Sequence, residues 1–225
     1  MSPSDELLEN YFHWYQQSIS HPLTNELCAG TLPDFKLFTY LVQDLKYFET
    51  GADLISKTMR LSDSKEASST IYEYIGGLST ENKYFHVCIH ELKQSEEVQK
   101  RVPHMLGENS ETLPAVKKYI DYLDYLLNES NSYVELITVV YIMEKVYLGW
   151  VEFNLQQGSI SKSLEYKHQE WIDLHSGEDF EKWVKFLAQE VDRVAPSDME
   201  TFEQTAKKTL ELEVEFFEDC YNYNS

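Results

Sequence analysis

Glycine, proline and cysteine are all scarce in this chain of 225 residues, which contains 8 Gly, 6 Pro and 3 Cys. So few helix-breaking residues favour long helices over a sandwich of many short strands. Cys28, Cys88 and Cys220 are odd in number, lie far apart and form no CxxC pair. This pattern argues against a disulfide framework or a zinc site, and it indicates a reducing compartment.

The chain also lacks a long apolar run and any excess of positive charge. No stretch of 18 apolar residues is present, and the first six residues lack the basic and apolar regions of a signal peptide. We therefore expect a cytoplasmic protein without a membrane span. Asp and Glu number 39 against 19 Lys and Arg, for a formal net charge of -20. Phosphate groups would repel this charge, so neither nucleic acid nor an anionic membrane is expected as a partner.

The spacing of apolar residues predicts an all-α protein with a single domain over residues 1–225. Between Ser132 and Phe153 the chain is apolar on nearly every side, and periodicity alone also fits a buried strand over Val139–Met143. The length of the pattern favours a central helix that is packed on all faces. The predicted helices cover about residues 5–20, 34–59, 68–94, 113–128, 132–153, 165–193 and 197–222, with a shorter helix before Pro103.

Two acidic residues occupy stripes that should face a core. Helical spacing aligns Asp44 with Leu37, Leu41 and Phe48, and aligns Glu213 with Phe202, Ala206, Thr209, Phe216 and Cys220. A carboxylate on such a stripe loses hydration, so it must be paired, be protonated or serve chemistry. The aromatic neighbours of both acids predict a pocket with a polar base. The alternatives are an ion pair of Asp44 with Lys46 and a solvated acidic face around Glu213.

Three further residues are candidates for a site. Glu144 lies in the most apolar segment, where it is either half of a buried pair with Lys145 or a catalytic group. His168 and His175 are seven residues apart and could share a helix face that binds a metal ion. Position 172, where a ligand between them is expected, is Ile, so a structural role is favoured and no metal site is predicted.

Several short motifs follow one another from about residue 10 to residue 222. They are His21-Pro22, Gly30–Leu32, Phe38–Tyr47, Lys118–Leu123, Tyr141–Tyr147, His168–Phe180 and Glu213–Phe217. In this order they resemble the TenA-type thiamin-salvage family. The resemblance implies a heme-oxygenase-like bundle of helices without heme or another cofactor, assembled as a homo-oligomer (dimer or tetramer). It also implies hydrolysis of aminopyrimidine breakdown products of thiamin, a small-molecule substrate.

The same resemblance implies a role for each matching residue. Asp44 matches the acid that binds the pyrimidine ring and its amino group, and Glu213 matches the glutamate that transfers protons. Tyr147 matches the tyrosine that supports the reacting centre. The other implied pocket residues are aromatic: Tyr47, Tyr119 and Phe216.

The chain departs from the better-known branch of that family at two positions. Met143 stands where that branch has a nucleophilic cysteine, and a thioether cannot form a covalent intermediate by the thiolate route. His175 replaces the tyrosine of a Trp-Ile-x-x-Tyr motif. The chain therefore resembles the branch without the cysteine, in which a glutamate at or beside that position is implicated. Glu144 is the nearest acid, one residue and about 100° further around the helix.

These residues predict hydrolysis by direct attack of water. Glu213 takes the proton from water and returns it to the amine, and Tyr147, together with His175, bonds the developing oxyanion. Deformylation of a formylated aminomethyl pyrimidine is the first expectation, and removal of the ring amino group is the second. One alternative is a catalytically silent pyrimidine-binding or assembly protein. Another is a dinuclear-metal oxidase that would use Glu81, Glu144, His168 and His175, although Cys88 and Ile172 fill places where ligands would be expected.

Overall fold

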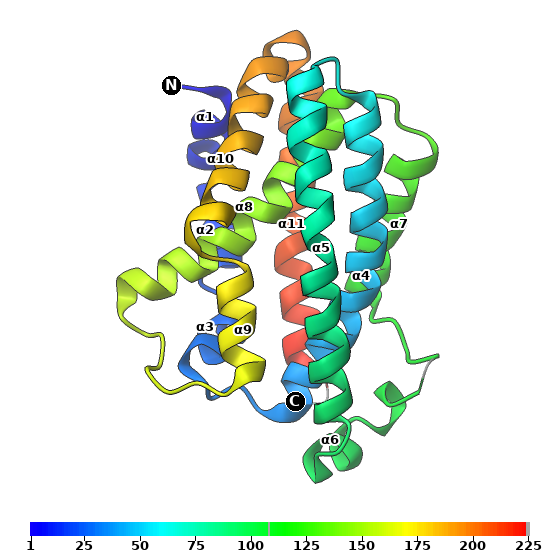
Figure 1. Ribbon diagram of the computed structural model, residues 1–225, viewed down its shortest axis with the longest axis vertical. Coiled ribbons are helices and arrows are strands. Elements are labelled where there is room, and N and C mark those ends of the chain that lie inside the picture. Colours follow the sequence, from blue (N-terminus) through cyan, green and yellow to red (C-terminus); the bar gives the residue numbers. More distant parts are fainter. Residues whose placement is uncertain (108, 224–225) are drawn as a thin grey trace.

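Helices make up the regular structure of residues 1–107 and 109–223, which are the residues that this computed structural model describes (Figure 1). Within these ranges there is no strand. Residues 108, 224 and 225, which the predicted domain includes, lie outside the described residues. The α-helices are α1 (Pro3–Asn10), α2 (Phe12–Ile19), α3 (Pro22–Ala29), α4 (Asp34–Leu61), α5 (Lys65–Leu92), α6 (Glu96–Arg101), α7 (Pro114–Asn128), α8 (Tyr133–Gln157), α9 (Tyr166–Leu174), α10 (Gly177–Val194) and α11 (Met199–Asn222), and Pro103–Met105 and Ala195–Ser197 form short 3-10 helices.

Helix α8 lies in the centre of the bundle. It packs against α2, α3, α4, α10 and α11, and its middle turns are buried on every side, with Trp150 fully enclosed. Residues 139–143 belong to this helix, so the predicted central helix is confirmed and the strand alternative is wrong. Helix α4 packs against α5, α7, α8 and α11. Helix α5 covers one side of the bundle (Figure 1).

Local sequence signals set the ends of the long helices. The side chains of Ser64, Ser132 and Asp198 each accept a hydrogen bond from a backbone N–H in the first turn of α5, α8 and α11. Gly30 and Gly158 end α3 and α8 with φ of 71° and 65°, a conformation that costs other residues energy. The predicted bounds of α4, α5, α7, α8 and α11 are confirmed to within a few residues.

The N-terminal prediction is wrong in two respects. The helix expected over residues 5–20 is two helices, because α1 ends at Asn10 and α2 begins at Phe12. No helix was predicted between residues 20 and 34, whereas Pro22 begins α3. Proline is tolerated in the first helical turn, where a backbone N–H would have no partner within the helix. The Nδ1 atom of His21 accepts a hydrogen bond from the N–H of Leu23 at 3.1 Å and caps this helix.

The helix predicted over residues 165–193 is also interrupted. Helix α9 ends at Leu174, and α10 begins at Gly177, where φ is 82°. This break places His175 at the end of α9 instead of in the middle of a long helix. Its side chain continues the buried stripe of His168, Trp171 and Ile172 into the interior, with only 4% of the residue exposed.

Both acid-containing stripes face the interior, as predicted. The buried residues include Leu37, Leu41 and Asp44 on α4 and all six residues of the α11 stripe. Cys28, Cys88 and Cys220 are buried free thiols. None of the helices that the structure describes has the length and apolar composition to cross a membrane.

Two contacts between helices depend on a single residue. Gly149 brings α8 so close to α2 that a Cβ atom there would lie 2.5 Å from the Tyr15 hydroxyl and 2.6 Å from Cγ2 of Ile19. Lys57 of α4 extends its Nζ to the end of α7, where it donates to the backbone carbonyls of Leu126 and Leu127, each at 2.9 Å. It also donates to the carbonyl of Ser130. These carbonyls would otherwise lack partners, since a helix leaves its last C=O groups unbonded.

Candidate active site

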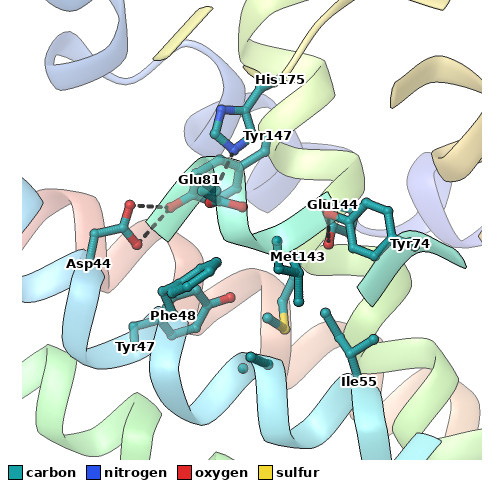
Figure 2. Close-up of a pocket in the computed structure, with 13 residues that line it drawn as sticks. Asp44, Tyr47, Phe48, Ile55, Tyr74, Glu81, Met143, Glu144, Tyr147 and His175 are labelled. Atoms are coloured by element: carbon teal, nitrogen blue, oxygen red, sulfur yellow. Dashed lines mark hydrogen bonds and ion pairs between the residues drawn. The ribbon is translucent and has the colours of Figure 1, made fainter. Parts of the chain in front are cut away.

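A cavity opens between α4, α5 and α8, close to the end of α9 (Figure 2). Its empty space is about 450 Å³, a figure that includes open solvent at the mouth. Aromatic rings and carboxylates share its wall. The lining residues are Asp44, Tyr47, Phe48, Gly51, Ala52 and Ile55 from α4, Tyr74, Leu78 and Glu81 from α5, Met143, Glu144 and Tyr147 from α8, and His175.

Asp44 lies at one end of this cavity and is 2% exposed. The Tyr147 hydroxyl donates to its two carboxylate oxygens at 3.2 and 3.3 Å (Figure 2). Burial raises the pKa of Asp44 to about 7, and the negative charge of Glu81 adds to this effect. The predicted alternative of a pair with Lys46 is wrong, because the Lys46 ammonium donates to backbone carbonyls of the 110–111 segment and to Thr112.

A chain of donors fixes the direction of the Tyr147 hydroxyl. The indole N–H of Trp171 donates to the Tyr40 hydroxyl at 3.2 Å, and Tyr40 and Tyr147 share a hydrogen bond of 3.2 Å. With the Tyr147 proton directed at Asp44, every polar atom in this buried series has a partner. Burial also raises the pKa of Tyr147, so its hydroxyl keeps its proton as a donor.

Glu213 is buried behind the cavity wall. Its carboxylate accepts from the Tyr119 hydroxyl at 2.7 Å and from the Tyr47 hydroxyl at 3.4 Å, and only 1% of the residue is exposed. Burial raises its pKa to about 8; the Tyr119 hydroxyl opposes this rise and the charge of Asp44 adds to it. The solvated acidic face considered for Glu213 is therefore wrong. Tyr47 connects this carboxyl with the cavity, because it both lines the cavity and donates a hydrogen bond to Glu213.

Tyr119 and Phe216 lie on the far side of Tyr47 from the cavity lining. Their ring centroids are 4.8 and 5.6 Å from that of Tyr47, so they support its ring from behind. Of the nine site residues that the sequence predicts, six line the cavity: Asp44, Tyr47, Met143, Glu144, Tyr147 and His175. The other three, Tyr119, Glu213 and Phe216, form a second layer around Tyr47.

Glu144 faces the cavity at the end opposite Asp44 (Figure 2). It accepts a hydrogen bond from the Tyr74 hydroxyl at 2.9 Å, and Tyr74 stacks on Trp183 with centroids 3.9 Å apart. Burial raises the pKa of Glu144 to about 7, and the charge of Glu81 contributes. The predicted alternative of a buried pair with Lys145 is wrong, because that lysine extends toward Glu152 at 3.5 Å.

Glu81 and His175 form a pair that was not predicted from the sequence. The Nε2 atom of His175 lies 3.7 Å from Oε1 of Glu81 (Figure 2), and its Nδ1 lies 2.8 Å from the backbone carbonyl of Trp171. Burial alone would lower the pKa of His175, but the negative charge of the nearby Glu81 carboxylate outweighs burial and raises that pKa. The signal for Glu81 was available, since it shares a helical stripe with the apolar residues Leu78, Phe85 and Cys88.

Metal-binding geometry does not occur at this site. Across residues 1–107 and 109–223, no group of three or more His, Cys, Asp or Glu side chains is placed to hold a metal ion. Glu81, Glu144 and His175 line the cavity, whereas His168 is not part of its wall and is buried without a hydrogen-bond partner for either ring nitrogen. The four ligands that the dinuclear-metal alternative requires therefore do not meet at one place.

Comparison with known families identifies the family of this chain. A sequence model of the TENA/THI-4/PQQC family matches residues 9–223. The chain belongs to this family. The predicted resemblance to TenA proteins is thereby confirmed at the level of the family. A comparison with curated proteins gave no match.

Solved structures of TenA proteins share the fold of this family member. A TenA homologue from Pyrococcus furiosus superposes with a TM-score of 0.78 at 20% identity, covering 99% of this chain and 100% of the other. A TenA homologue from P. horikoshii gives a TM-score of 0.80 at 16% identity, with 98% and 99% covered. A putative TenA-like thiaminase from Sulfolobus solfataricus gives 0.74 at 16% identity, with 96% and 94% covered. The predicted all-α, heme-oxygenase-like bundle is confirmed.

Proposed function

We propose that this TENA/THI-4/PQQC family member hydrolyses a C–N bond in a small aminopyrimidine related to thiamin. The position of Asp44 supports this proposal more than any other observation. It is a buried carboxyl at the end of a ring-lined cavity, and such a group can pair with the amino group and ring nitrogen along one edge of an aminopyrimidine. The likeness to a putative TenA-like thiaminase supports the same class of substrate.

Deformylation of a formylated aminomethyl pyrimidine is the preferred reaction. Water adds to the formyl carbon, the C–N bond then breaks, and formate and the free amine leave. Two protons must move: the attacking water loses one, and the leaving nitrogen gains one. Met143 lines the cavity at the position where the resemblance implies a thiol in the better-known branch. Direct attack by water is therefore favoured over a covalent intermediate.

Each residue near the ligand has a part in this reaction. Asp44 anchors the amino edge of the ring, and Tyr47 and Phe48 hold its faces. When the amino edge of the ligand takes its place at Asp44, the Tyr147 hydroxyl turns to the formyl oxygen and stabilises the negative charge that develops there. The ionised form of Glu213, which predominates only above about pH 8, accepts the proton of the attacking water through the Tyr47 hydroxyl, which lies 3.4 Å from its Oε1.

Asp44→Leu tests the anchor. The substitution keeps the approximate size of the side chain and removes both oxygens, so an aminopyrimidine edge loses both of its hydrogen-bond partners. We expect pyrimidine binding to weaken about 10- to 100-fold, as for loss of a hydrogen bond to a charged or strongly polarised group. Glu49→Leu on the same helix is the control, because Glu49 is exposed and away from the cavity lining. Equal binding by the Asp44→Leu variant and the wild type would refute the anchor.

Product analysis separates the remaining possibilities. Purified protein is incubated with a formylated aminomethyl pyrimidine and, separately, with the free aminomethyl pyrimidine, and formate and ammonia are measured. Formate release supports deformylation, and ammonia release supports removal of the ring amino group. Binding without release of either product identifies the silent pyrimidine-binding protein. The homo-oligomeric state remains a prediction of the resemblance, and analytical ultracentrifugation tests it.

A further inference from the structure

The proposed reaction needs a proton donor for the nitrogen that leaves, which must gain a proton before or during C–N cleavage. The sequence predicted that Glu213 returns this proton, but Glu213 does not line the cavity and is separated from it by Tyr47. The donor must border the cavity, carry a proton near neutral pH and lie close to the oxyanion site at Tyr147.

His175 meets each of these geometric conditions. It lines the cavity, and its ring centroid is 4.8 Å from that of Tyr147. Its Nδ1–H is committed to the Trp171 carbonyl at 2.8 Å, which leaves only Nε2 for a second proton. A proton on Nε2 makes the ring a cation, and that cation would face Glu81 at 3.7 Å.

The surroundings of His175 favour the cation. Glu81 approaches it from α5, Asp44 lies across the cavity on α4, and Glu144 and the Tyr147 hydroxyl lie on α8. No Lys or Arg is among the residues that line the cavity. The groups that face the ring from α9 and α10 are the aromatic side chains of Trp171 and Phe180, which carry no charge. An imidazolium in this place is balanced by carboxylates instead of being repelled.

We propose that His175 is the general acid of this site and that Glu81 is the residue that holds it in its protonated form. The proposal rests on the proposed hydrolysis. When the C–N bond breaks, its electron pair goes to nitrogen, and nitrogen takes the proton from Nε2 of His175. The ring becomes neutral, with its remaining proton on Nδ1. It regains a proton from solvent after the amine has left, while the proton taken up by Glu213 returns to solvent. Water and the formylated amine thus give formate and the amine in balance.

Glu81 is a positioning residue in this scheme, and its role has a specific signature. Glu81→Gln removes the negative charge beside Nε2 and keeps the side-chain length. An opposite charge within about 4–6 Å changes a pKa by roughly 1–3 units. The basic limb of the kcat–pH profile, which reports loss of the acid's proton in the bound complex, should therefore move to lower pH by about 1 unit or more. A purely structural role would lower kcat at all pH values and leave this limb in place.

Three variants and two measurements test the proposal. His175→Gln should lower kcat by about 10²–10⁴-fold, as for loss of a general acid, and should abolish the basic limb. Glu73→Gln is the matched control for Glu81→Gln, because Glu73 is an exposed glutamate on the same helix. It should leave both kcat and the profile unchanged. The histidine titration is followed independently by NMR of the folded protein, with His175→Gln used to assign the His175 resonance.

The outcomes distinguish this proposal from the proposed function. A lower His175 pKa in Glu81→Gln by NMR, together with the moved basic limb, supports both. If hydrolysis occurs but the basic limb of the Glu81→Gln profile stays in place, or if His175→Gln has near wild-type kcat, then His175 is not the general acid. The proposed hydrolase function stands in that case. No release of formate or ammonia by the wild type from either pyrimidine overturns the hydrolase and the general acid together.

Discussion

The buried carboxyl of Glu213 should make the stability of this protein depend strongly on pH. Burial raises its pKa from 4.5 to about 8. Between these two values the unfolded chain has released this proton while the folded chain retains it. The folded state therefore binds more protons, and its free energy of unfolding decreases as pH rises through this window. At 1.36 kcal/mol per pKa unit, the full loss above pH 8 is about 5 kcal/mol.

Glu213→Gln isolates this contribution. The amide has nearly the same shape, still offers an oxygen to the Tyr119 hydroxyl, and does not titrate. We expect the wild type to be the more stable protein at pH 5 or nearly equal to the variant. Between pH 5 and pH 9 the wild type should lose about 4 kcal/mol of unfolding free energy relative to the variant. The reason is that only the wild type has a carboxyl at this position, which binds its proton more tightly in the folded state than in the unfolded state.

Urea unfolding at intervals from pH 5 to pH 9 measures this difference. The slope of the unfolding free energy against urea concentration is compared for each protein as well, because a different slope indicates a changed unfolded state. Glu203→Gln is the control, since Glu203 is an exposed glutamate on the same helix. A difference between wild type and Glu213→Gln that stays constant within about 1 kcal/mol over this range would refute the claim that Glu213 is buried and protonated near neutral pH.

Two further predictions concern contacts between helices. Gly149→Ala should lower the free energy of unfolding by about 1–3 kcal/mol, because the new methyl group overlaps Tyr15 and Ile19 and forces α2 away from α8; an unchanged melting temperature would contradict the close approach. Lys57→Met should cost about 1–3 kcal/mol in urea unfolding, because the end of α7 loses its charged donor while the aliphatic stem is retained. Lys65→Met, at an exposed lysine in the first turn of α5, is the control and should have little effect.

The long helices were predictable because their signals are local. Apolar spacing, capping side chains and the glycines at their ends all lie within the segments concerned. The division between α1 and α2 at Tyr11 has no such signal. Helix α1 packs on α10, whereas α2 packs on α8 and α11, so tertiary packing determines where the chain turns. Helix α3 was missed because proline both stops a preceding helix and begins a following one.

The burial of the acidic site residues was also predictable from local sequence patterns. An acid on an apolar stripe identified Asp44 and Glu213 as buried, and the same rule applied to α5 would have identified Glu81. The rule does not say which buried acid borders a cavity, because that depends on the helices that become neighbours. Tyr47 lies between Glu213 and the cavity, and His175 reaches Glu81 because α9 packs against α5.

The three carboxyls with raised pKa values also give the cavity a capacity to exchange protons with its ligand. Asp44 and Glu144 titrate near pH 7 and Glu213 near pH 8. A cationic guest would stabilise their ionised forms, so its arrival expels hydrogen ions into the surrounding buffer and its affinity rises with alkalinity. A neutral guest lacks this linkage. The affinity of the cavity for a cationic ligand therefore depends on pH, whereas its affinity for a neutral ligand of similar shape does not.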